Sequence, residues 1–150
     1  MNASDYTISF AVDQKPGAVF EAINNVRAWW SETIEGVTDK PGATFTYRYR
    51  DVHQSTQKIS EFVPGKKVVW HVTEARINFV QDQTEWVGTD IVFEIGRKGK
   101  KTELRFTHVG LTPTVECYGK CSGAWSFYIN ESLRQLIISG KGQPDTAEES

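Results

Sequence analysis

Two side chains in this sequence could handle a proton in an apolar environment. His108 follows Leu104 and Phe106 at two-residue spacing, so a strand would point its ring to the same side as theirs. An imidazole there could orient a ligand or act as a general base, or it could be structural and hydrogen-bonded to backbone. Glu61 shares the parity of Ile59, but a β-bulge between them would turn it outward, and we predict the outward orientation. His108 and Glu61 are the candidate catalytic residues, and neither is assigned a catalytic role.

The two cysteines are the next residues whose spacing suggests chemistry. Cys117 and Cys121 would lie one helical turn apart, so a metal ion could bridge them. Zinc needs three or four protein ligands, however, and His53, His71 and His108 are scattered over strands or loops. We therefore expect no metal and no cofactor. We interpret the cysteines as small apolar thiols, kept reduced in an intracellular setting.

Aromatic residues give the main functional signal. Phe, Trp and Tyr make up 12% of the chain, and the ring N–H of Trp and the hydroxyl of Tyr need a partner when buried. Many such rings on inward faces favour a pocket with apolar walls and a few hydrogen-bonding groups over a dry core. Trp29 and Trp30 could close its mouth. The predicted lining comprises Trp29, Tyr47, Tyr49, Trp70, His108, Trp125, Tyr128 and Ser132.

A long helix is expected to position several of these rings. The pattern from Tyr118 to Ile138 is amphipathic and would extend roughly 30 Å. Gly140 is the predicted C-terminal stop. Phe127 and Ile138 fall on the face opposite Trp125, which predicts either a homodimer contact or cover from the loop at 29–38.

The rest of the chain reads as strands separated by turns. Apolar and polar residues alternate over about 6–12, 44–50, 57–63, 68–72, 89–95 and 103–108. Two short helices are expected after the first strand, and Pro64-Gly65 predicts a hairpin turn. The segment 77–83 is ambiguous between strand and loop. We predict an α+β domain in which a curved antiparallel sheet of about six strands wraps around the C-terminal helix. The single domain spans 1–150, with a core of about 5–139 and a flexible tail over 141–150.

Composition excludes several classes of function. A formal charge of −2 and a pI near 5.9 favour neither nucleic acid nor an anionic membrane surface. The sequence has no apolar run of the roughly 18 residues that a membrane span needs. It shows no signal peptide, so a cytoplasmic location is expected. Motifs of serine hydrolases, zinc proteases, P-loop and dinucleotide-binding proteins are also missing.

The order and spacing of four segments resemble the START-like superfamily of helix-grip proteins. Within it, they resemble the bacterial proteins related to the activator of Hsp90 ATPase. The segments are 15–30 (KPGAVFEAINNVRAWW), 59–64 with 68–70, 102–111, and 123–125 with 132–136. The resemblance implies a sheet curved around the long helix, enclosing a cavity. Members bind lipids, hormones, polyketides or other apolar molecules, and a minority are enzymes.

Three functions follow, in order of preference. The first is a protein that binds an apolar or aromatic small molecule in an internal cavity. The second is a cyclase- or hydrolase-like enzyme acting on an aromatic or polyketide-like substrate, which would need His108 or Glu61 in the pocket. The third, implied by the resemblance, is a module associated with an Hsp90-type chaperone. This chain lacks the Asn-rich and Trp-rich signature of the co-chaperone's stimulating domain.

Overall fold

The helices and strands follow the predicted order. A computed structural model of the chain describes residues 5–49, 53–77, 81, 84–113 and 118–144. The strands are β1 Tyr6–Val12, β2 Glu35–Gly36, β3 Thr44–Tyr49, β4 His53–Val63, β5 Lys67–Ile77, β6 Asp90–Lys98 and β7 Lys101–Val109. The first helices are α1 Pro16–Asn24 and the 3-10 turn η1 Val26–Ala28. The C-terminal helix is continuous and consists of α2 Tyr118–Trp125, the π-helical η2 Ser126–Leu133 and α3 Arg134–Ser139.

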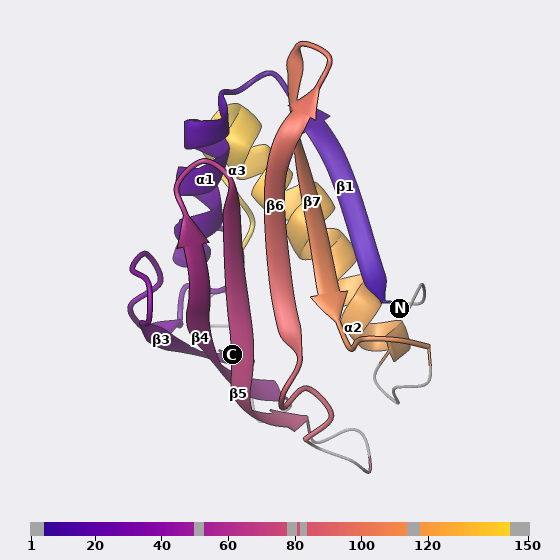
Figure 1. The fold of residues 1–150 in the computed structure, drawn as a ribbon. Coiled ribbons are helices and arrows are strands. Elements are labelled where there is room, and N and C mark those ends of the chain that lie inside the picture. The colour runs from indigo at the N-terminus through magenta and orange to yellow at the C-terminus, as the bar shows by residue number, and fades with distance from the viewer. Residues whose placement is uncertain (1–4, 50–52, 78–80, 82–83, 114–117, 145–150) are drawn as a thin grey trace.

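The strands form one antiparallel sheet that curves around the C-terminal helix (Figure 1). The order is β1-β7-β6-β5-β4-β3-β2, so the first strand closes one edge by pairing with the last. The helix-grip prediction is confirmed, with a seventh strand, the two-residue β2, added at the other edge. Gly36 in β2 has φ 110°, and a Cβ there would lie 2.4 Å from the carbonyl oxygen of Thr44. This close approach requires glycine.

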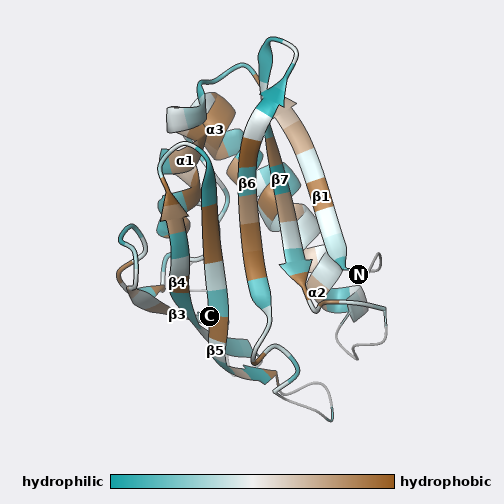
Figure 2. Ribbon diagram, viewed as in Figure 1, coloured by the Kyte–Doolittle hydropathy of each residue, from teal (hydrophilic) through white to brown (hydrophobic). Residues whose placement is uncertain are grey.

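Alternation along the strands separates an inner face from an outer face. In β7, Thr102, Leu104, Phe106 and His108 are buried, and the residues between them are partly or fully exposed. Figure 2 shows brown apolar stretches along β5 and β6. The core lies between this inner face, α1 and the C-terminal helix. His108 thus occupies the buried position that its strand parity predicts.

The C-terminal helix keeps one face buried by changing its winding. Its buried residues Cys121, Trp125, Ile129, Leu133 and Ile137 recur every four residues. In a regular α-helix of about 3.6 residues per turn, this spacing would drift around the axis. The i→i+5 bonding of the π-helical segment widens the turn and reverses that drift. A regular wheel favours Leu136 for the inner face, whereas the structure buries Ile137 and leaves Leu136 half-buried.

The chain folds back after the helix ends. Gly140 adopts the left-handed conformation (φ 83°) and donates its N–H to the carbonyl of Leu136, as the predicted stop requires. The backbone N–H of Gln143 donates to Ser132 Oγ across 2.7 Å. The segment 141–150, predicted to be a flexible tail, thus contacts the helix through Gln143, and 145–150 lie outside the described residues. The predicted helix start near Thr112-Pro113 also meets undescribed residues, 114–117.

Two strand boundaries differ from prediction in ways that affect the site. β4 begins at His53, four residues before the predicted start, and pairs with both β3 and β5. β5 continues to Ile77, so the ambiguous segment starts as strand, while 78–80 and 82–83 are not described. A register irregularity in β4 between Ile59 and Glu61 matches the bulge that would turn Glu61 outward.

Candidate functional site

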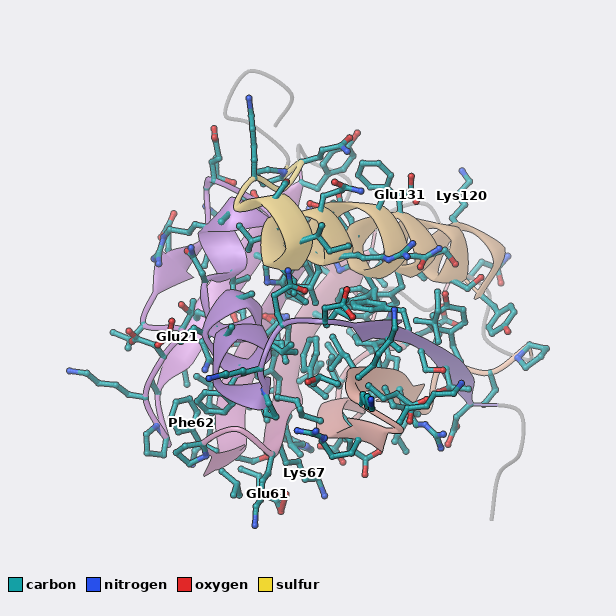
Figure 3. All side chains as sticks on the ribbon, turned by 90° about the horizontal axis from the view of Figure 1, so that it is seen from above. Glu21, Glu61, Phe62, Lys67, Lys120 and Glu131 are labelled. Atoms are coloured by element: carbon teal, nitrogen blue, oxygen red, sulfur yellow. The ribbon has the colours of Figure 1, made fainter. Side chains whose placement is uncertain are left out.

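A pocket of about 490 Å³ lies between the first half of the C-terminal helix and the β3–β4 end of the sheet. The helix contributes five residues, and the sheet and its connections contribute the others. The lining residues are Trp30, Tyr47, Tyr49, His53, Trp86, Lys120, Cys121, Ala124, Trp125 and Tyr128. Lys120, at the start of the helix, extends on the side away from the sheet (Figure 3). The other lining side chains are mostly aromatic.

Stacked rings make the pocket walls rigid. Trp30 stacks on Tyr47 with ring centroids 4.1 Å apart and an interplanar angle of 11°. Trp125 lies 5.0 Å from Trp30 and also stacks on Trp86 at 5.9 Å. Such packing leaves each ring few alternative rotamers. The walls therefore present flat apolar surfaces to any planar molecule that enters.

Trp86 reaches the pocket from the turn that precedes β6. The turn is fixed by Val87 N–H donating to the Thr84 carbonyl, and by Gly88 N–H donating to the carbonyl of Val72 in β5. These bonds fix the turn from which the Trp86 ring makes edge-to-face contacts with two histidines. Its centroid lies 4.5 Å from that of His53 and 4.6 Å from that of His108.

Two nitrogens of the pocket wall are buried without a hydrogen-bond partner among the described residues. They are Nε2 of His53 and the indole Nε1 of Trp86. Unpaired buried polar atoms are rare, because each forfeits a hydrogen bond that water would provide. Burial also lowers the pKa of His53 to about 4, so its ring is neutral at pH 7.

His108, by contrast, has a partner for each ring nitrogen. Trp125 Nε1–H donates to His108 Nδ1 across 3.1 Å. The Thr89 hydroxyl uses its only proton on the Trp86 carbonyl, 2.6 Å away, so it must accept at its oxygen from His108 Nε2–H, 2.8 Å away. Burial, and secondarily the nearby His53, lowers the pKa of His108 to about 3. His108 is therefore a neutral Nε2–H tautomer whose two nitrogens are both occupied.

Glu61 lies outside the site. Its carboxylate forms an ion pair with Lys67 Nζ at 3.1 Å, and roughly half of its side chain is exposed. Figure 3 shows both residues on the side of the sheet away from the C-terminal helix. The bulge in β4 accounts for this direction, and the predicted outward orientation is confirmed.

The family model described as "Activator of Hsp90 ATPase homolog 1-like protein" matches residues 13–137. The chain belongs to this family. The match covers α1, the strands β2 to β7 and nearly all of the C-terminal helix. No curated protein matches the chain well enough to identify a relative.

Solved structures of bacterial proteins share the fold of this Hsp90-activator-like domain. The Aha1 dimer from Colwellia psychrerythraea is 23% identical, with a TM-score of 0.73 over 92% of this chain and 98% of its own. A Mesorhizobium loti protein is 12% identical, with a TM-score of 0.71 over 93% and 99%. CalU16 from Micromonospora echinospora is 14% identical, with a TM-score of 0.61 over 90% and 76%. At these identities the likeness establishes the fold alone.

The predicted lining residues of this domain divide into two groups. Tyr47, Tyr49, Trp125 and Tyr128 line the pocket, while Trp29, Trp70, His108 and Ser132 do not and are fully buried. The second group forms the layer behind the wall. Trp29 Nε1–H donates to the Ile23 carbonyl, and the Ser132 hydroxyl donates to the Trp29 carbonyl. Strand parity indicated the inward face correctly but could not separate the pocket from the core behind it.

Trp30, His53 and Trp86 are the main lining residues absent from the predicted set, although Trp30 was expected at the mouth. His53 was missed because β4 was predicted to begin at Gln57, which left the histidine in a loop. In the structure His53 pairs with Tyr49 and extends the β3–β4 hairpin. A hairpin continued past Tyr49 would have placed His53 on a strand. Trp86 lies in a turn with no periodic pattern, so the sequence offered no comparable signal.

The interpretation of the cysteines changes in part. Cys121 is buried at the pocket and is disulfide-bonded, so the prediction of a reduced thiol is wrong for this residue. The prediction had inferred a reduced thiol from the expected intracellular location, and that location does not fix the redox state of a single cysteine. Cys117 lies outside the described residues.

Within the described part of the chain, no three His, Cys, Asp or Glu side chains gather as a metal site would require. Nor is any helix there both long and apolar enough to cross a bilayer.

Proposed function

We propose that this protein binds a small apolar or aromatic molecule in the pocket between its C-terminal helix and sheet. One observation supports the proposal above others: a cavity of about 490 Å³ with walls of stacked aromatic rings. Small-molecule sites are typically about 300–1,000 Å³, mostly apolar, with a few polar groups that fix orientation. Tyr47, His53 and Trp86 provide groups of that kind.

The arrangement favours binding over turnover. A general base needs an atom within reach of the substrate, but both nitrogens of His108 are engaged behind the pocket wall. Glu61 is exposed on the other side of the sheet. His53 borders the pocket, and its pKa near 4 makes it a weak base at neutral pH. The enzyme alternative therefore requires groups other than the two predicted candidates.

Binding can be tested by titrating the protein with N-phenyl-1-naphthylamine, whose fluorescence rises in apolar sites. We expect saturable binding with a Kd on the order of micromolar. Ala124→Trp should abolish it, since residue 124 lines the pocket and is exposed, so a large side chain can fill the cavity without disturbing the core. Glu131→Trp is the matched control, because Glu131 projects from the same helix away from the sheet (Figure 3).

If the fluorescence of the probe rises equally with both variants, the probe binds elsewhere and the proposed pocket is contradicted. Native mass spectrometry of protein purified from its own host gives a second test. A co-purified apolar molecule, lost in the Ala124→Trp variant, would support the proposal. Failure of every aromatic probe to bind wild-type protein would overturn it.

The second element of the proposal is self-association through Phe127 and Ile138. These side chains are 41% and 46% exposed, on the outer side of the C-terminal helix. Large exposed apolar side chains on one face often mark a contact surface, and the Colwellia psychrerythraea relative was solved as a dimer. Sedimentation at micromolar concentration should show a dimer that Phe127→Ser together with Ile138→Ser dissociates. A wild-type protein that stays monomeric would exclude it.

Association with an Hsp90-type chaperone is the third element, and its basis is the family alone. Pull-down with an Hsp90-type ATPase is the direct test. Retention of the ATPase on immobilised protein, but not on a denatured control, would support this role, and no retention would remove it.

A further inference from the structure

We infer that the molecule bound in this pocket is a planar aromatic that carries a hydroxyl group, held between Nε2 of His53 and the indole N–H of Trp86. The inference rests on the proposed function and goes further, because it names the chemical class of the ligand and the two residues that select it. Both residues line the pocket, and their ring centroids are 4.5 Å apart.

The first step is the contrast between neighbouring polar groups. Around His108, every polar atom of the chain from Trp125 through Thr89 to the Trp86 carbonyl is paired. Close to this network, the Nε1 of Trp86 and the Nε2 of His53 have no partner within the described residues. Each unpaired buried group forfeits a hydrogen bond that water would provide in the unfolded chain. Among the unpaired buried atoms of the described residues, only these two belong to residues that line the pocket, so an external group is expected there.

The second step is the kind of group that would fit. The Trp86 indole can only donate, so the ligand must bring an acceptor. A neutral imidazole carries its proton on one nitrogen, and a bare buried acceptor is less costly than a buried unpaired N–H. We therefore assign the His53 proton to Nδ1, which leaves Nε2 as an acceptor. The ligand group must then accept from Trp86 and donate to His53.

A hydroxyl is the smallest group that does both. Its oxygen accepts the Trp86 N–H while its proton goes to His53 Nε2. An aromatic ring attached to that hydroxyl would extend toward the rings of Trp30 and Trp125, whose centroids lie 5.0 Å apart. A carboxylate would bring no proton for His53, and an ammonium would bring no acceptor for Trp86.

Three probes of nearly equal shape separate the two hydrogen bonds. 2-Naphthol can donate and accept, 2-methoxynaphthalene can only accept, and naphthalene can do neither. At pH 7, we expect each hydrogen bond to add roughly tenfold in affinity, since about 1.4 kcal/mol corresponds to a factor of ten. The order of affinity should be 2-naphthol, then the methyl ether, then naphthalene, as measured by calorimetry or by quenching of tryptophan fluorescence.

Two variants show which nitrogen causes each difference in affinity between the probes. His53→Phe keeps an aromatic ring but removes the acceptor, so 2-naphthol and its methyl ether should bind equally well. Trp86→Phe removes the donor, so the methyl ether should lose its advantage over naphthalene. Trp70→Phe is the matched control, because the Trp70 Nε1 is also buried and unpaired but Trp70 does not line the pocket. This variant should keep the full order of affinities.

The possible results distinguish this inference from the proposed function. If all three probes bind wild-type protein with equal affinity, the ligand class is wrong and the binding pocket stands. If Trp70→Phe changes the order as Trp86→Phe does, the indole assignment is wrong. If no probe binds, the proposed function itself fails. Retained naphthalene binding and near-ultraviolet circular dichroism show that each variant is folded.

Discussion

The indole N–H of Trp125 donates to Nδ1 of His108 across 3.1 Å, which ties the C-terminal helix to the last strand of the sheet. Replacing His108 with Leu would leave the Trp125 N–H without its partner and remove the donor to Thr89. A buried group left unpaired costs about 1–3 kcal/mol. We expect His108→Leu to lower the free energy of unfolding in urea by about 2–5 kcal/mol. A change in unfolding free energy below about 0.5 kcal/mol would show that the hydrogen bonds of His108 to Trp125 and Thr89 contribute little to stability.

The same variant tests whether His108 positions the pocket wall. Because Trp125 forms part of the pocket wall, losing its hydrogen bond should weaken binding of N-phenyl-1-naphthylamine several-fold. His108→Gln can still pair with Trp125 through its amide oxygen and should recover part of that affinity. Loss of binding in both variants to the same extent would contradict the positioning role.

The two buried histidines make stability depend on pH. His53 and His108 have folded-state pKa values of about 4 and about 3, below the ordinary value of 6.5. Below pH 6.5 the unfolded chain binds protons that the folded chain excludes, so stability is complete above that pH and falls as the pH decreases. The slope of the unfolding free energy against pH approaches about 1.4 kcal/mol per pH unit for each histidine, until that histidine is protonated in the folded protein as well.

We therefore expect the urea midpoint to fall steadily between pH 6.5 and pH 4. The double variant His53→Gln, His108→Gln should lose most of that slope, although it is less stable at pH 7. An unchanged slope in the double variant would assign the acid sensitivity to carboxylates instead.

Glu61→Gln should be nearly silent. The Glu61–Lys67 pair lies at the surface, with 39% of the Lys67 side chain and 49% of the Glu61 side chain exposed. Exposed ion pairs contribute about 0–1 kcal/mol, and less in salt. We expect unchanged probe affinity and a change in unfolding free energy below about 0.5 kcal/mol at 0.15 M salt. A large loss of ligand binding would show that Glu61 acts on the pocket after all.

The sequence predicts the architecture well because the architecture follows from periodicity. Alternation in β3, β5, β6 and β7 defines an inner face, and tight turns make the sheet antiparallel. The inward direction of His108 follows from the same rule. The outward direction of Glu61 also depends on the bulge in β4, which periodicity alone does not reveal.

Periodicity is insufficient where a local departure decides the outcome. The π-helical segment shifts the buried face from Leu136 to Ile137, and neither residue signals that change. Trp86 reaches the pocket from a turn, so no spacing rule applies to it. The division between Trp30 at the pocket and Trp29 behind it depends on the backbone after η1, since neighbouring residues of identical chemistry take opposite roles.

Gly142 provides the last prediction, because it lets the returning chain lie against the helix. A Cβ at this position would lie 2.3 Å from the Ala28 carbonyl oxygen and 3.2 Å from Ser132 Oγ. Real Cβ atoms do not approach backbone so closely, so Gly142→Ala must displace the segment and its Gln143–Ser132 hydrogen bond. We expect a loss of about 1–3 kcal/mol in unfolding free energy.

Gly123→Ala is the matched control for that substitution. Gly123 lies within α2, and a Cβ there meets nothing within 4 Å. Alanine favours a helix over glycine by about 0.8–1.0 kcal/mol, so this variant should be stabilised. Thermal unfolding should move the two variants in opposite directions from wild type. If both alanines stabilise the protein, the return of the chain to Ser132 adds nothing to the fold.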